Sequence, residues 1–210
     1  MWRLSYFDFE NSTFKDFEFF NLASIQAPYI LNLSKFVELN NSLVNKFVLT
    51  WDQTSCDKID TSISKSFLDL EIILSSSGQT VDFKILLLST QKISFRLNLL
   101  LKHLAPKTKA NVVSKAVLDD GAKLDFLGCI YVAKQAQKTT TALLTKSLLL
   151  SSNSQVKALP YLQIFNKDID CKHGATVSNL EQVKLNYLLS KGISNLQAKN
   201  FLIDSFLYYV

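Results

Sequence analysis

From about residue 68 the chain carries a series of short apolar runs of strand length, and this recurrence limits the folds that it can adopt. Each run is followed by Ser, Asn, Asp, Gly or Lys, which are residues that end strands and form turns. In the run at 93–99 the odd positions are apolar and the even positions are polar, as in a strand with one buried face. A mainly β fold is therefore expected. The runs occupy residues 70–74, 83–88, 93–101, 112–118, 124–132, 143–150 and 161–165.

The apolar runs also resemble one another at their ends. Residues 73–76, 87–90 and 149–152 each read as two aliphatic residues followed by two hydroxyl residues. Weak self-similarity of this kind is typical of a solenoid or β-helix, in which each coil buries its face against the next. A β-sandwich would also contain many short strands, and Asp120-Gly121 between two apolar runs is a hairpin signal. The periodicity alone leaves both folds open.

The last part of the chain has helical patterns instead. Ser178 with Glu181, and Ser194 with Gln197, have the spacing of capping boxes, so two helices should begin at these points. Gly192 stands where the first helix would end. The terminus carries more aromatic residues than closing the core requires, which leaves room for a partner surface. These aromatic residues are Phe206, Tyr208 and Tyr209.

The beginning of the chain is rich in Phe, but its spacing fits neither a helix stripe nor strict alternation. We expect residues 1–67 to form an N-terminal cap or the start of the core. Residues 68–177 should form the β core, and residues 178–210 the C-terminal helices.

The composition fits one folded domain. A chain of 210 residues with 48% hydrophobic and 20% charged residues can bury one sizeable core. No apolar run approaches the roughly 18 residues that a membrane helix needs, and the N-terminal sequence does not have the pattern of a secretory signal. Three widely spaced cysteines, Cys56, Cys129 and Cys171, give no disulfide framework, so a cytoplasmic location is expected.

Charge and motifs argue against two classes of function. The net charge of +5 comes from scattered lysines, which indicates a solvated surface rather than a nucleic-acid site. With only five glycines the chain has no Gly-rich phosphate loop, and it has no GxSxG or HExxH motif, so we expect no enzyme and no catalytic residue. The adjacent Asp119 and Asp120 precede Gly121 and are interpreted as a turn.

Cys171 and His173 stand two residues apart in a strand-like stretch. Alternate residues of a strand share a face and lie about 6.5 Å apart, so a thiol and an imidazole could converge on one bound species. Thiolate and imidazole are ligands of iron and of iron-sulfur clusters. The other reading is that Cys171 is a small core residue and His173 a hydrogen-bonded polar one. Closed metal sites normally need four ligands, and no CxxC or HxxH accompanies this pair.

Five sequence blocks occur together in one order that resembles the core domain of the SufB/SufD family. The resemblance covers roughly residues 100–206, and the Cys-x-His-Gly-Ala-Thr block is most similar to SufD. The blocks are His-Leu-Ala-Pro at 103–106, Val-Leu-Asp-Asp-Gly-Ala at 117–122, Gln-Ala-Gln-Lys-Thr at 135–139, Leu-Leu-Leu-Ser at 148–151 and Cys-Lys-His-Gly-Ala-Thr-Val at 171–177.

The resemblance implies a right-handed parallel β-helix with a C-terminal helical segment. It also implies a scaffold subunit that pairs with a SufB-like subunit and docks a SufC-like ATPase through its C-terminal helices. His173, with Cys171 as a second residue, would then face a transient iron-sulfur cluster at the subunit interface. No nucleic-acid or membrane partner is implied.

The chain departs from the family pattern in two respects. Thr145, Lys146 and Ser147 stand where relatives have an asparagine-rich approach, and Ala158 and Leu159 interrupt a Thr-Lys-Pro motif. The chain is also about half the usual length of the family, with the missing part mostly N-terminal. An alternative from another class is a β-helix carbohydrate-active protein similar to polysaccharide lyases. That function would need charged residues clustered in one groove, together with a secretion signal.

Overall fold

The structure is a computed structural model that describes residues 18–21, 29–32, 44–52, 65–89, 92 and 94–208. Most of residues 1–67 lie outside these ranges. The expectation of a cap or core start there, and with it the three-part division at residues 67 and 177, stays a prediction.

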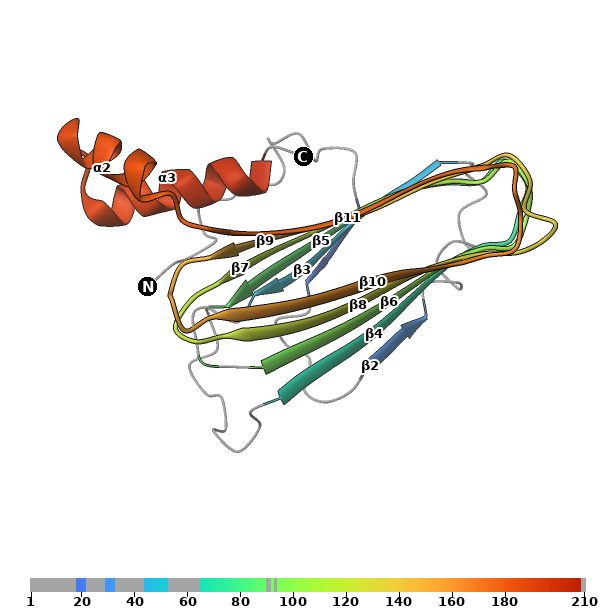
Figure 1. Ribbon diagram of the computed structural model, residues 1–210, viewed down its shortest axis with the longest axis horizontal. Helices are drawn as coiled ribbons and strands as arrows, with labels where there is room; N and C mark the ends of the chain where they lie inside the picture. Colours follow the sequence, from blue (N-terminus) through green and yellow to red (C-terminus); the bar gives the residue numbers. More distant parts are fainter. Residues whose placement is uncertain are drawn as a thin grey trace.

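The strands form two parallel sheets that face each other (Figure 1). Successive strands alternate between the sheets, so the chain winds as a flattened solenoid with a strand on each side of every coil. Sheet A has the order β1-β3-β5-β7-β9-β11 and sheet B the order β10-β8-β6-β4-β2. The strands are β1 (Glu18–Asn21), β2 (Tyr29–Asn32), β3 (Val44–Asp52), β4 (Lys65–Leu74), β5 (Thr80–Ser89), β6 (Ser94–His103), β7 (Lys109–Leu118), β8 (Lys123–Val132), β9 (Thr139–Leu149), β10 (Gln155–Ile164) and β11 (Ile169–Asn179).

This arrangement confirms the predicted parallel β-helix and excludes the β-sandwich. Every pairing between the described strands is parallel, whereas a sandwich of hairpins is antiparallel. The hairpin reading of Asp120-Gly121 was wrong, because β7 and β8 on either side of it belong to different sheets. The pair does form a turn, with φ of 47° at Asp120 and 74° at Gly121.

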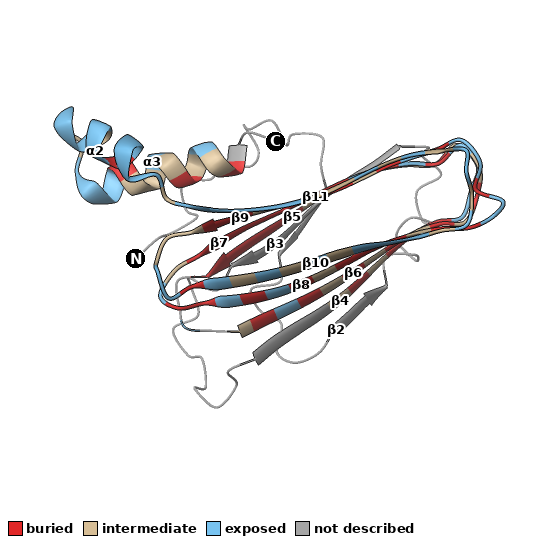
Figure 2. Ribbon diagram, in the orientation of Figure 1, coloured by how far each residue is buried: buried red, intermediate tan, exposed pale blue. Residues whose placement is uncertain are grey.

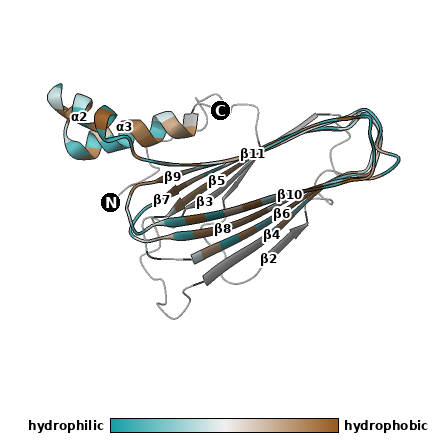
Figure 3. Cartoon of the chain, in the orientation of Figure 1, coloured by the Kyte–Doolittle hydropathy of each residue, from teal (hydrophilic) through white to brown (hydrophobic). Residues whose placement is uncertain are grey.

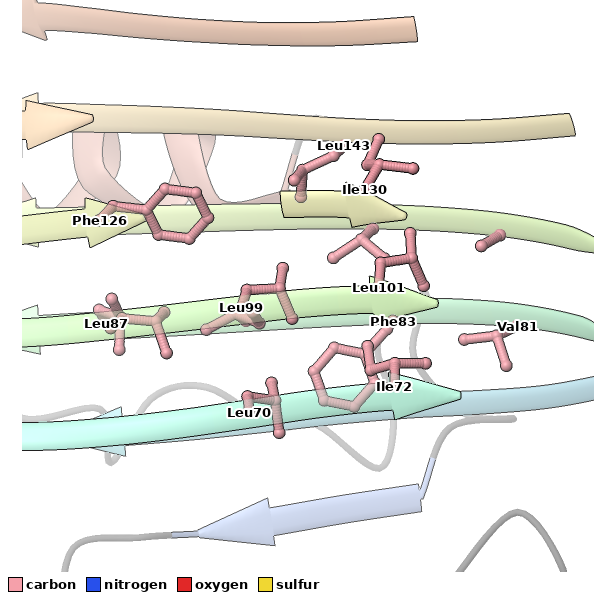
Figure 4. Close-up of a cluster of buried hydrophobic side chains, with 14 of the residues drawn as sticks. Leu70, Ile72, Val81, Phe83, Leu87, Leu99, Leu101, Phe126, Ile130 and Leu143 are labelled. Carbon is pink, nitrogen blue, oxygen red and sulfur yellow. The ribbon is translucent and has the colours of Figure 1, made fainter. Parts of the chain in front are cut away.

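The core lies between the sheets and is built by stacking side chains from coil to coil (Figure 4). Phe83 pairs in register with Val112, and Val112 pairs with Leu143, so equivalent inward positions of successive coils contact one another. Full burial of such a side chain contributes about 1.5–3 kcal/mol. Hydrophobic and hydrophilic residues alternate along β8 and β10, as this inward and outward alternation requires (Figure 3).

The turns that lead into sheet A also stack. Gly78, Lys107 and Lys138 all have positive φ, at 78°, 59° and 56°. The Gly78 amide donates to the Pro106 carbonyl oxygen at 3.1 Å, and the Lys107 amide donates to that of Gln137 at 2.7 Å. A left-handed conformation costs a non-glycine residue about 1–2 kcal/mol, and hydrogen bonds from one coil to the next offset that cost.

Helices α2 (Gln182–Ser190) and α3 (Asn195–Tyr208) follow the last strand. The capping box at Ser194 is confirmed. Ser194 Oγ accepts a hydrogen bond from the Gln197 backbone amide at 3.4 Å, and Gln197 Oε1 accepts one from the Ser194 backbone amide. The capping box at Ser178 was wrong, since β11 continues to Asn179 and α2 has no side-chain cap. No helix in the described part of the chain is long and apolar enough to cross a membrane.

Helix α3 covers part of the outer face of sheet A (Figure 1, Figure 2). Ile203 and Leu207 of the helix pack against outward-facing residues of β5, β7 and β9. Lys115 of β7 lies beneath the end of the helix, where its Nζ donates to the carbonyl oxygens of Phe206 at 2.7 Å and Leu207 at 2.9 Å. Burial, with Lys146 and Lys84 nearby, lowers the pKa of Lys115 from 10.5 to about 8. The strand residues in this contact are Leu86, Leu88, Val117 and Leu148.

The last coil leaves one end of the solenoid uncovered. β10 and β11 are the final strands of their sheets, and neither contains a fully buried residue (Figure 2). In contrast, most residues of β7, which lies in an earlier coil, are buried. Within the described residues, the inward side chains of β10 and β11 therefore form an open end.

A substitution at Gly128 tests how closely the side chains between the two sheets are packed. A Cβ atom at this inward position would lie 2.7 Å from Phe126 Cε1 and 2.8 Å from Leu143 Cδ2. Gly128→Ala should therefore lower the free energy of unfolding by about 1–3 kcal/mol through overpacking, as measured by urea denaturation. Gly174→Ala is the control, because its Cβ would meet only Leu144 Cδ2 at 3.3 Å. Equal stability of the two variants would contradict this packing.

Candidate functional site

Cys171 and His173 lie on the inner face of β11, the edge strand at the open end. Cys171 pairs in register with Thr141, and His173 pairs with Leu143 of the core cluster. Cys171 itself packs against that cluster. The structure therefore places the predicted thiol and imidazole on one face, as the strand period required.

Both groups are partly buried, and burial sets their protonation. It raises the pKa of the Cys171 thiol, with a further contribution from the nearby Asp170 carboxylate. It lowers the pKa of His173. At neutral pH the pair is therefore a thiol and an uncharged imidazole. The imidazole is already in the form that ligates metal ions, whereas the thiol must release its proton when a metal binds.

The two histidines differ in their surroundings. His103 is fully buried in β6, and its Nδ1 is 2.8 Å from Thr108 Oγ1, which donates to the Ala105 carbonyl oxygen at 3.2 Å. Thr139 Oγ1 lies 3.4 Å from Thr108 Oγ1 and extends this network into the next coil. Among the described residues neither His103 Nε2 nor His173 Nε2 has a hydrogen-bond partner, although both atoms are buried, but the His173 residue as a whole is only partly buried. His103 thus has a structural role, and the histidine with an uncommitted nitrogen beside the open end is His173.

Sequence reasoning missed the hydroxyl groups inside the last coils. Ser114, Thr141 and Ser147 are buried on the inner face of sheet A, and their side-chain oxygens have no hydrogen-bond partner in the described part of the chain. The signal that could have found Thr141 is the coil length, since Thr141 stands one coil before Cys171. Without the register, a threonine so far from Cys171 in the sequence has no visible relation to it.

The remaining cysteines do not join this pair. Cys129 is a free, buried thiol on β8 in the other sheet, where burial raises its pKa and Tyr161 is its hydrogen-bond partner. Cys56 lies outside the described residues. Within the part of the chain that the structure describes, no three His, Cys, Asp or Glu side chains lie together as a metal site would need.

The burial of His103 predicts how stability changes with pH. Its pKa is lowered from 6.5 to about 4, so between these values the unfolded chain binds a proton that the folded chain does not. The free energy of unfolding should fall by up to about 3 kcal/mol as the pH drops from 6.5 to 4. Urea titrations across this range should show that His103→Leu removes most of this fall, whereas His173→Ala retains it. A larger effect of His173→Ala would reverse the two roles.

Comparison with known proteins agrees with this arrangement. The family model described as "SUF system FeS cluster assembly, SufBD core domain" matches residues 44–206. An iron-sulfur cluster assembly SufBD family protein of Synechocystis is 37% identical over 101 residues, which are 48% of this chain and 22% of that protein. The iron-sulfur cluster assembly protein SufB of Bacillus subtilis is 30% identical over 105 residues, covering 50% and 23%. The matched segments thus span less than a quarter of these relatives. The family model covers more than half of the residues of this chain, so the chain belongs to the SufBD core domain family.

Proposed function

We propose that the chain is a SufD-like scaffold subunit of an iron-sulfur cluster assembly complex in the cytoplasm. It pairs with a SufB-like subunit and docks a SufC-like ATPase, which carries out nucleotide hydrolysis, so the chain itself is not an enzyme. The observation that carries the proposal is the placement of Cys171 and His173 on one inner face at the open end. The relatives are named as iron-sulfur cluster assembly proteins, which is the basis for the proposed process. The Cys-x-His-Gly-Ala-Thr block at 171–176 is the basis for the resemblance to SufD.

The open end has the properties of a pairing surface. In the described part of the chain, β10 and β11 each have one edge without a neighbouring strand, and edge strands offer unpaired backbone groups to a partner. Leu159, Leu162 and Val177 on these strands are exposed, as is Phe165 just after β10. Exposed apolar side chains beside a free edge favour a second sheet as the partner.

Cys171 and His173 supply only two ligands, whereas a cluster is held by four. A partner subunit at the open end would supply the others, and the cluster would be a cargo that forms between the subunits. Two ligands on each side hold a cluster less firmly than four on one chain, which suits transfer. Membership of this family leaves nothing to favour the carbohydrate-active alternative.

The C-terminal helices provide the surface for the ATPase. Val183 is 81% exposed and Tyr187 61% exposed on α2, and Leu196 and Phe201 of α3 are also exposed. We call these four exposed apolar side chains the helical patch; Val183 and Tyr187 lie about one turn apart on α2. Such a patch on an otherwise folded pair of helices favours docking of a partner.

Cluster assembly tests the pairing site. His173→Ala and Cys171→Ser should each abolish or strongly reduce cluster formation, measured as iron-sulfur absorbance in the assembled complex. Cys129→Ser is the matched control, since it removes a buried thiol from the opposite sheet and should leave cluster formation unchanged. Normal cluster formation in the His173→Ala complex would remove the proposed role of the site.

Point variants of the helical patch test ATPase docking. Removing the helices would uncover Leu86, Leu88 and Val117, so a truncated chain would confuse folding with binding. Val183→Ser combined with Tyr187→Ser should weaken copurification of the ATPase without changing the melting temperature, because both side chains are exposed. Lys184→Ser on the same helix is the control, since its ion pair with Glu181 is exposed and contributes little. Unchanged copurification would place the docking surface elsewhere.

A further inference from the structure

In sheet A the buried inward hydroxyl groups are concentrated on β9, the strand beside β11. The inward residues of β5 and β7 are mostly apolar, and each strand carries one buried inward hydroxyl, at Ser89 and Ser114. β9 carries four buried inward hydroxyls, at Thr139, Thr141, Thr145 and Ser147. β11 then presents Cys171 and His173. Polar groups thus gather behind the candidate site, where a solenoid interior is normally apolar.

Three of the inward hydroxyl oxygens, those of Ser114, Thr141 and Ser147, have no hydrogen-bond partner among the described residues, and Thr141 is distinguished by its neighbours. Thr141 is 1% exposed, and leaving such a buried hydroxyl unpaired costs about 1–3 kcal/mol. It is the register partner of Cys171 on the adjacent strand, and adjacent strands lie about 4.8 Å apart. His173, one inward position further along β11, also has a buried unpartnered atom, Nε2. Ser114 lies one strand further from β11, and Ser147 pairs with Val177.

We propose that Thr141 is a positioning residue for a metal site, where its hydroxyl donates a hydrogen bond to Cys171 Sγ once that sulfur is bound to a metal ion. The inference rests on the proposed function, in which Cys171 and His173 are the ligands. When the metal–sulfur bond forms, the thiol proton leaves to solvent and the thiolate becomes a hydrogen-bond acceptor. Thr141 then satisfies both its own unpaired hydroxyl and the sulfur, and His173 Nε2 stays available to the metal. The metals suited to this donor set are soft or borderline divalent ions and the iron of a cluster.

The residue type at 141 fits this role. A β-branched side chain is restricted in χ1, so its hydroxyl is held in a narrow range of directions. Groups that hydrogen-bond to metal ligands orient those ligands, and their loss typically weakens metal binding 10–100-fold. Valine has nearly the shape of threonine without the hydroxyl, so Thr141→Val isolates this one contact.

Cobalt binding to the full chain tests the inference. Co²⁺ is the probe, and its thiolate charge-transfer absorbance reports the Cys171–metal bond directly. Thr141→Val should weaken Co²⁺ binding about 10–100-fold. Its melting temperature without metal should stay the same or rise, because a methyl group replaces an unpaired buried hydroxyl. Thr141→Ser keeps the hydroxyl and should retain most of the affinity.

Ser147→Ala is the matched control, because it removes another unpartnered buried hydroxyl that has no ligand beside it. It should leave Co²⁺ binding unchanged, and an equal loss of affinity in Ser147→Ala would overturn the specific role of Thr141. Wild-type affinity in Thr141→Val, with binding lost in Cys171→Ser and His173→Ala, would overturn the role of Thr141 and leave the proposed function standing. Wild-type affinity in all three variants, or no charge-transfer band in the wild type even when it is assembled with a SufB-like subunit, would overturn both.

Discussion

The fold depends on the register in which one coil lies on the next. Each inward residue contacts the equivalent residue of its neighbouring coils, as Phe83, Val112 and Leu143 do. A parallel strand that slipped by one residue would turn its whole apolar set outward, so the buried face holds every strand in place. The stacked turns reinforce this register, since an amide of one coil donates to a carbonyl of the next at Gly78 and Lys107. The candidate site inherits its geometry from this stacking.

Repetition made the fold predictable, whereas the helix boundaries depended on tertiary contacts. The recurring apolar runs indicated many short strands, but only the family resemblance separated a β-helix from a sandwich. Ser178 and Ser194 have the same capping spacing in the sequence and behave differently. Ser178 remains in β11, whose pairing with β9 continues to Asn179, and the Leu180 amide then donates to the Leu149 carbonyl oxygen. Pairing with a neighbouring coil therefore prevailed over the local signal for a helix.

The candidate site was predictable to the extent that it lies on one strand. Alternation placed Cys171 and His173 on the same face, and the structure agrees. Thr141 could not be found in this way, because its position beside Cys171 depends on the length of the intervening coil. The turns set that length, and their left-handed residues include Lys138, which no sequence rule singles out. His103 and His173 also look alike in the sequence, and only burial and the contact with Thr108 separate them.

Lys115 joins α3 to the sheet in a way that apolar packing alone would not. Its ammonium group is buried under the helix end, where the carbonyl oxygens of Phe206 and Leu207 and the negative end of the helix dipole receive it. Lifting the helix would break both hydrogen bonds, and water would have to replace them at the ammonium group and at the two carbonyl oxygens. Helix α3 is therefore held on sheet A by a polar contact at β7 as well as by the apolar contacts of Ile203 and Leu207. The helices are thus attached at two places, by contacts at β7 in sheet A and by the covalent link to β11 at its edge.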